Sequence, residues 1–112
     1  MNKTDRTLLE AAAKAAGIEL FAVFGPVSNF EGFRAKREDG DTWNPLTDDG
    51  DALRLAVKLG IGVLFDVQDE KITAYQQQPC DGYFVEFADD DGPLAATRRA
   101  IVRAAASMVV KT

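Results

Sequence analysis

Carboxylates, arginines and a tryptophan are the side chains of this sequence that could take part in chemistry. The carboxylates gather in two stretches, and the candidates among them are Asp39, Asp41, Asp48, Asp49, Asp51, Asp89, Asp90 and Asp91. Closely spaced carboxylates can collect oxygen ligands for a divalent cation, or they can accept hydrogen bonds from the free N–H groups at a helix start. Residues 39–50 depart from the calcium-binding loop pattern, because Trp43 takes its fifth position and Gly50 its last. We therefore expect capping and solvation here, and no metal site.

Three arginines near the end of the chain are a second candidate. Arg98, Arg99 and Arg103 follow a helical pattern in which Arg99 and Arg103 share a face, four residues apart. Together they could bind a phosphate, a nucleotide or an acidic partner. The alternative is a solvated helix face, which is the more common place for arginines on an amphipathic helix. The sequence leaves both interpretations open.

Trp43, the only tryptophan, lies in a polar loop just before a helix. It could cover the end of the core as a hydrophobic staple, while Pro45 fixes the entry of the chain into the helix. It could also be an exposed anchor for a partner, since tryptophan is common at interface hot spots. We favour the staple, and keep Trp43 together with the eight aspartates as the candidate partner-binding residues.

Several kinds of active site are excluded by residue types that the sequence lacks. Without histidine there is no Ser-His-Asp triad, no Cys-His pair and no His-containing zinc site. The glycines form neither the P-loop pattern nor the GxGxxG pattern of phosphate-binding turns. The one cysteine, Cys80, lies in a predicted turn with no neighbouring base to activate it. We predict no catalytic residues, no cofactor and no enzymatic activity.

Length and composition set the class of protein. The chain has 112 residues, 46% of them hydrophobic, which is enough for one core and predicts a single domain over residues 1–112. Its 13 basic and 18 acidic side chains give a net charge of −5, which repels nucleic-acid phosphates and anionic membranes. No apolar run approaches the roughly 20 residues needed to span a bilayer, and a single cysteine forms no intramolecular disulfide. We expect a cytoplasmic protein that binds neither membranes nor, directly, nucleic acid.

Periodicity predicts an α+β fold with a mainly antiparallel sheet and helices packed on it. Helical spacing that ends at glycine favours helices, and β-branched or aromatic runs bounded by turn residues favour strands. The predicted order is α-β-β-α-β-β-β-α, over residues 3–16, 18–24, 30–38, 48–59, 62–68, 71–77, 83–89 and 93–110. The first two strands are expected to form a hairpin, and the last three an antiparallel meander.

The same patterns predict which helix faces are buried. The apolar face of the second helix comprises Ala52, Leu53, Ala56, Val57 and Leu59, opposite Asp51, Arg54 and Lys58. The buried stripe of the last helix comprises Leu94, Ile101, Ala105 and Met108, widened by Val102 and Val109. We expect Thr47 or Asp49 to cap the second helix and Gly60 to end it.

Two stretches resemble a pattern found in small uncharacterised proteins of bacteriophages and prophages. DTWNPLTDDGDALRLAVKLGI, residues 41–61, is similar to the W-N-P motif and following helix of that group, and RRAIVRAAA, residues 98–106, is similar to its closing helix. The resemblance covers residues 41–108 and brings no catalytic residues with it. It implies a bacterial host cell as the setting.

Small acidic phage proteins without enzymatic motifs often bind and disable a host protein, so the resemblance implies a non-enzymatic interaction protein. Its most concrete version is an inhibitor of a CRISPR or other defence complex, whose basic nucleic-acid groove would meet the acidic surface of this chain. The alternative is a small-molecule or nucleotide-binding module that uses Arg98, Arg99 or Arg103.

Overall fold

The computed structural model describes residues 3–24, 30–35, 42–76, 83–87 and 92–108, and it has the predicted α+β class. Its helices are α1 (Lys3–Ala16), α2 (Asp49–Leu59) and α3 (Gly92–Ser107). Its strands are β1 (Leu20–Phe24), β2 (Phe30–Ala35), β3 (Thr42–Trp43), β4 (Ile61–Asp66), β5 (Lys71–Gln76) and β6 (Tyr83–Phe87). The predicted hairpin and the predicted antiparallel meander are both confirmed.

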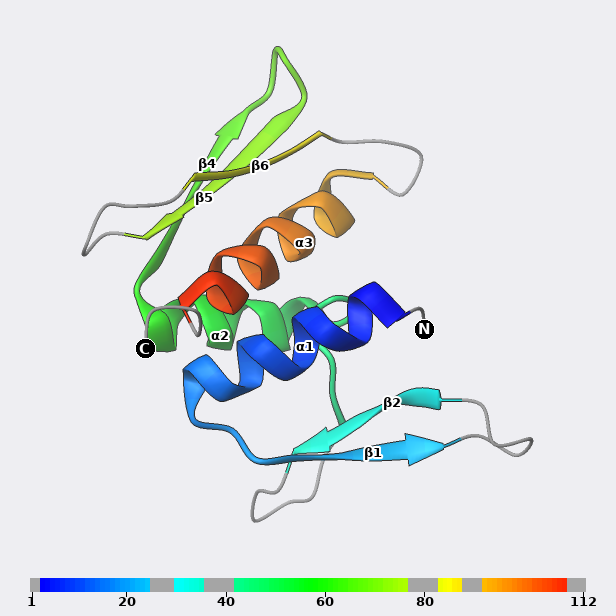
Figure 1. The fold of residues 1–112 in the computed structure, drawn as a ribbon. Helices are drawn as coiled ribbons and strands as arrows, with labels where there is room; N and C mark the ends of the chain where they lie inside the picture. Colours follow the sequence, from blue (N-terminus) through cyan, green and yellow to red (C-terminus); the bar gives the residue numbers. More distant parts are fainter. Residues whose placement is uncertain (1–2, 25–29, 36–41, 77–82, 88–91, 109–112) are drawn as a thin grey trace.

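The prediction of one sheet is wrong, because the strands form two separate antiparallel sheets, β1-β2-β3 and β4-β5-β6. The helices lie between these sheets, as Figure 1 shows. The predicted order also lacked β3, a strand of two residues that pairs with Phe33 and Arg34 of β2. A strand this short has no periodicity of its own, so only its pairing with β2 reveals it.

Helix α3 forms the centre of the core. It packs against α1, α2 and the β4-β5-β6 sheet, and its alanines allow these neighbours to approach closely. Ile101, Val102 and Ala105 are buried as predicted, and Met108 packs against the core. Leu94, predicted to be buried, is 63% exposed and lines an open pocket, although the neighbouring Ala95 and Ala96 are buried. Val109 lies outside the described residues.

The buried face of α2 differs from the predicted one. Ala52, Leu55 and Ala56 face the core, whereas Leu53 and Val57 are 64% and 74% exposed. Asp51, predicted to face solvent, is buried. The helix is therefore rotated by about one residue from the predicted orientation, and this leaves two large apolar side chains at the surface.

The ends of α2 explain part of that orientation. The cap is Asp48, and not Thr47 or Asp49, because the Asp48 side chain accepts a 2.8 Å hydrogen bond from the backbone N–H of Asp51. Gly60 ends the helix in the left-handed conformation, with φ of 69°, as predicted. The chain then turns directly into β4.

Candidate functional site

The acidic residues around α2 are occupied in holding the helix start. Asp48 is its cap, and Asp49 forms an ion pair of 2.5 Å with Arg98 of α3. Asp48 and Asp49 remain about half-exposed, with side chains 58% and 60% accessible. Their charges are thus balanced in part within the chain, which weakens the prediction that they form a free acidic surface.

Asp51 is buried and hydrogen-bonded within the chain. Its side chain is 5% exposed and accepts hydrogen bonds from the backbone N–H of Asn44, at 2.9 Å, and from Arg54 Nη2, at 2.7 Å. These contacts tie the segment before α2 to the first turn of the helix. Asp51 is therefore not the solvent-facing carboxylate that the sequence predicted, and its role in partner binding stays a prediction that its burial does not favour. The other predicted aspartates, Asp39, Asp41, Asp89, Asp90 and Asp91, lie outside the described residues.

Trp43 is part of the core. It is 2% exposed and its backbone pairs with Phe33, so the indole cannot act as an exposed anchor in this structure. Burial near the start of α2 is what the staple interpretation predicted, and a role of Trp43 in partner binding stays a prediction that its burial does not favour. The physical reason for this position is the large apolar area of the indole ring, whose burial in the core is favourable.

The three arginines of α3 do not form one strip. Arg98 donates to the carbonyl of Leu46, at 2.8 Å, and pairs with Asp49, so it joins α3 to the start of α2. Arg99 and Arg103 both pair with Glu86 of β6, and the Arg103 guanidinium also lies 5.5 Å from the ring centroid of Phe84.

These partners account for most of the arginines' charge. A shallow pocket of about 350 Å³ is lined by Arg98 and Arg99 with Asp5, Leu46, Thr47 and Ala95, but an acidic side chain already faces each arginine. Among the residues described, the arginines therefore act mainly as bridges between α3 and its neighbours.

A feature that the sequence did not predict is an apolar cleft between α2 and β4. These elements diverge from Gly60, as Figure 1 shows, and a space of about 480 Å³ between them is lined by residues of α2, β4 and α3. One wall is formed by Leu53 and Val57 and the other by Val63 and Phe65, while Leu94 and Ile101 come from α3. We call this space the apolar cleft.

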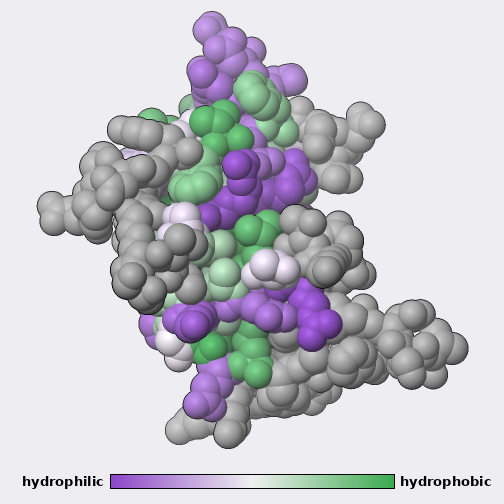
Figure 2. Space-filling view, in the orientation of Figure 1, coloured by the Kyte–Doolittle hydropathy of each residue, from purple (hydrophilic) through white to green (hydrophobic). Residues whose placement is uncertain are grey.

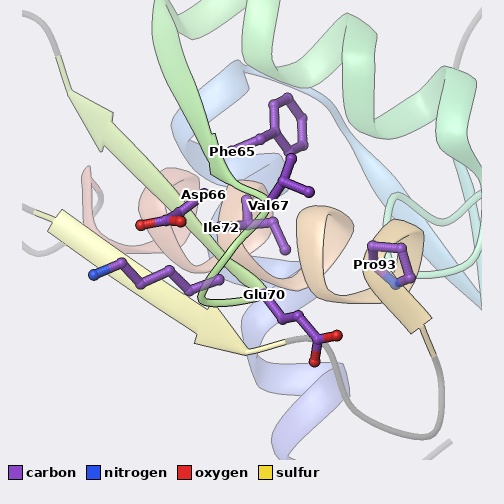
Figure 3. A pocket seen from close by; sticks show the side chains of 7 residues that line it. Phe65, Asp66, Val67, Glu70, Ile72 and Pro93 are labelled. Atoms are coloured by element: carbon purple, nitrogen blue, oxygen red, sulfur yellow. The ribbon is translucent and has the colours of Figure 1, made fainter.

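A second hollow of about 430 Å³ continues from the cleft beneath the β4–β5 hairpin and shares Phe65 with it. Figure 3 shows Phe65, Val67 and Ile72 on the side toward Pro93 of α3, whereas Asp66 points to the opposite face of the sheet. Figure 2 shows hydrophobic residues at the surface just below the hydrophilic tip of this hairpin.

Large apolar side chains are exposed around the cleft and also on the opposite face of the β4-β5-β6 sheet. Within the described part of the chain, the cleft is lined by Leu53, Val57, Phe65 and Leu94, and the adjoining hollow by Val67. The opposite face carries Leu64, Val85 and Phe87, which alternate along their strands with residues facing α3; all eight side chains are at least 40% accessible. Single exposed apolar residues are normal, but a contiguous group around a cleft is typical of a binding surface. The signal in the sequence was the run IGVLFDV, which has more apolar residues than one buried strand face needs.

Other kinds of site find no support in the residues described. In residues 3–24, 30–35, 42–76, 83–87 and 92–108, no three potential metal ligands lie together. No helix of the same ranges has the length and hydrophobicity to cross a membrane. Cys80 falls outside them. Comparisons with protein-family models, with curated proteins and with solved structures found no match to the chain.

Proposed function

We propose that this chain is a non-enzymatic interaction protein that binds another protein through the apolar cleft. The observation that carries the proposal is the exposure of Leu53, Val57, Phe65 and Leu94 around one concave space. Burying these apolar side chains would make the folded chain more stable. Their exposure to water therefore costs free energy, and burial against a partner would offset that cost.

The dimensions and lining of the cleft favour a protein segment over a small molecule. Its walls are almost entirely aliphatic or aromatic, and its one charged pair, Asp49 with Arg98, is already satisfied. A small-molecule site usually adds several convergent polar groups that fix the orientation of the ligand. A protein surface needs an apolar centre with a polar rim, which this region has.

The magnitude of the hydrophobic term indicates how large the interface must be. Burying the exposed parts of Leu53, Val57, Phe65 and Leu94 would contribute about 1–2 kcal/mol each, or roughly 4–8 kcal/mol together. Association itself costs about 4–15 kcal/mol. The four residues alone would thus hold a partner weakly, and a stable complex must use further contacts along β4 or the hairpin.

The proposed partner is a host protein in the bacterial cytoplasm, and a CRISPR or other defence complex is its most concrete version. This part of the proposal rests on the resemblance of residues 41–108 to phage proteins, together with the net charge of −5. The negative charge would favour a partner with a basic surface and steer its approach, while the apolar cleft would supply most of the affinity.

The alternative, a nucleotide-binding module built on Arg98, Arg99 and Arg103, has weaker support. Arg98 is directed to α2 and the other two to β6, and each already contacts a carboxylate. A nucleotide phosphate would have to displace these partners before it gained its own hydrogen bonds.

Capture from a bacterial lysate with substituted chains tests the proposal. Leu53→Arg and Val57→Arg place a charge in the cleft at positions 64% and 74% exposed, so the fold is expected to tolerate them. Thr7→Arg, on the exposed face of α1, is the matched control. The captured protein is identified by mass spectrometry and its affinity for each purified chain is measured by calorimetry. We expect at least tenfold weaker binding for both cleft variants and wild-type affinity for the control. Equal affinity for all the chains would show that the cleft is not the binding site.

A further inference from the structure

The edge of β4 faces the apolar cleft and has no strand paired with it among the residues that the structure describes. In the sheet order β4-β5-β6, β5 occupies one side of β4 and the other side is an edge. Figure 3 shows β5 on one side of the strand that leads to Phe65, with α2 beyond the other side. The unpaired N–H and C=O groups of an edge strand are a template for another strand.

The usual protections of an edge are missing from β4. It is six residues long, IGVLFD, with no proline or lysine, and its one charged residue is Asp66 at the end. Its pairing with β5 runs without a bulge from Ile61 to Asp66. Natural edge strands are commonly short, bulged or charged because such features prevent uncontrolled pairing. A regular and apolar edge of six residues beside a cleft lacks these protections, and it is suited to pair with a further strand.

The opposite edge of the same sheet, β6, is contacted by arginine side chains of α3. On β6, Arg103 Nη1 donates to the backbone carbonyl of Val85 at 3.3 Å, and Glu86 is held by Arg99 and Arg103. Arginine side chains of α3 thus lie against β6 and take up one of its carbonyls. This contrast within one sheet points to β4 as the edge that accepts another strand.

We propose that the partner enters as an extended segment that pairs with the β4 edge, places alternate apolar side chains in the cleft and carries a basic residue beside the hairpin. Strand addition would supply the backbone hydrogen bonds, and Leu53, Val57 and Phe65 would contact every second side chain. This inference rests on the proposed function, because it names the form of the partner at the same cleft.

The proposed basic residue of the segment follows from charge complementarity with the β4–β5 hairpin. The hairpin between β4 and β5 carries Asp66, Asp69 and Glu70 against Lys71 alone, an excess of two negative charges. Glu70 lines the hollow that continues from the cleft, so a lysine or arginine at that end of the segment would meet a carboxylate. A glutamate at the same place would be repelled.

A synthetic peptide of alternating valine and threonine with a lysine at each end is the probe. It is titrated into the full-length, isotope-labelled chain, and the backbone amides of Ile61–Asp66 are followed by NMR. In two further peptides alternate backbone nitrogens are methylated, so that each of these peptides keeps its N–H groups along one edge only. A fourth peptide has glutamates in place of the lysines.

Strand addition predicts that β4 amides shift, that one N-methylated peptide binds like the parent and that the other does not. The glutamate peptide is expected to bind at least fivefold more weakly, with a difference that shrinks at high salt. Loss of binding by both N-methylated peptides would indicate a helix in the cleft, and retention by both would indicate side-chain contacts alone. Either result overturns the inference, as does the absence of β4 shifts at millimolar peptide.

Two controls separate this inference from the proposed function and from self-association. If Leu53→Arg abolishes capture of the cellular partner but no peptide shifts β4, the function stands and strand addition fails. If the peptide pairs with β4 while Leu53→Arg leaves partner capture unchanged, the β4 edge accepts a strand but the cellular partner does not bind at the cleft, and the proposed function fails. The remaining possible occupant of the β4 edge is a second copy of the chain, which sedimentation of the free chain at increasing concentration tests. A dimer in which the β4 amides are protected would show that the second copy pairs with β4, and this result would overturn the proposal.

Discussion

Replacing Asp51 with alanine separates the structural role of the acidic stretch from a role in binding. In the sequence Asp48, Asp49 and Asp51 look equivalent, but the structure buries only Asp51. Asp51→Ala removes the acceptor of the Asn44 backbone N–H and of Arg54 Nη2. It keeps the cap, because the bond from the Asp51 backbone N–H to Asp48 does not use the Asp51 side chain.

The expected loss follows from these contacts. The Asn44 N–H is partly buried and would be left without its acceptor, which costs about 1–3 kcal/mol. Loss of a negative charge in the first turn of α2 adds roughly 0.3–1 kcal/mol. Arg54 is 64% exposed and can return to water, so its lost bond adds little. We expect a destabilisation of about 2–3 kcal/mol, or roughly 8–12 °C in Tm for a chain of this size.

Urea unfolding followed by circular dichroism measures this loss, and Asp49→Ala is the matched control. The Asp49 side chain is 60% exposed and makes one ion pair, so its removal is expected to cost less than about 1 kcal/mol. Asp51→Asn, which keeps one acceptor oxygen, is expected to lie between the two. If Asp51→Ala proves no more costly than Asp49→Ala, the assigned contacts do not hold the start of α2, and the reasoning from burial fails.

Three other predictions follow from single residues. Trp43, 2% exposed, is expected to give blue-shifted fluorescence that resists acrylamide in the native state and shifts to the red on unfolding; emission of a solvated indole in the folded chain would contradict its burial. Gly60→Ala is expected to cost about 1 kcal/mol in thermal or urea unfolding, since φ is 69° and nothing lies within 4 Å of the added methyl, and Asn at the same place is expected to cost less. Glu86→Ala is expected to cost roughly 1–3 kcal/mol by leaving Arg99 and Arg103 without their shared carboxylate, whereas Glu86→Gln is expected to restore part of the loss; a neutral Glu86→Ala would show that this bridge does not stabilise the fold.

The predicted elements were close to the observed ones because their signals are local. The first helix was predicted over residues 3–16 and α1 covers Lys3–Ala16, since strong helix formers and a terminal glycine act within one segment. The antiparallel meander was predicted from runs separated by turn residues, and β4, β5 and β6 pair in that way. Such features depend on neighbours in the chain, which the sequence shows directly.

The rotation of α2 was not predictable in the same manner. Leu53, Leu55 and Val57 are all apolar, so more than one face of the helix could serve as the buried one. The choice depends on α3, whose small alanines accept Ala52, Leu55 and Ala56 at close range, and on Asn44, whose N–H requires the Asp51 carboxylate. Both determinants lie outside the helix itself.

By itself, the sequence determined the α+β class, the approximate bounds of most elements and the lack of histidine chemistry, because composition and periodicity are properties of the chain alone. Only the tertiary structure decided that there are two sheets, that Trp43 and Asp51 are buried, and that Arg98 faces α2 while Arg99 and Arg103 face β6. It also created the apolar cleft, which exists because α2 and β4 diverge from Gly60 over α3. The side chains of these surfaces come from distant segments, and the free energy of packing all segments together decides which of them remain exposed.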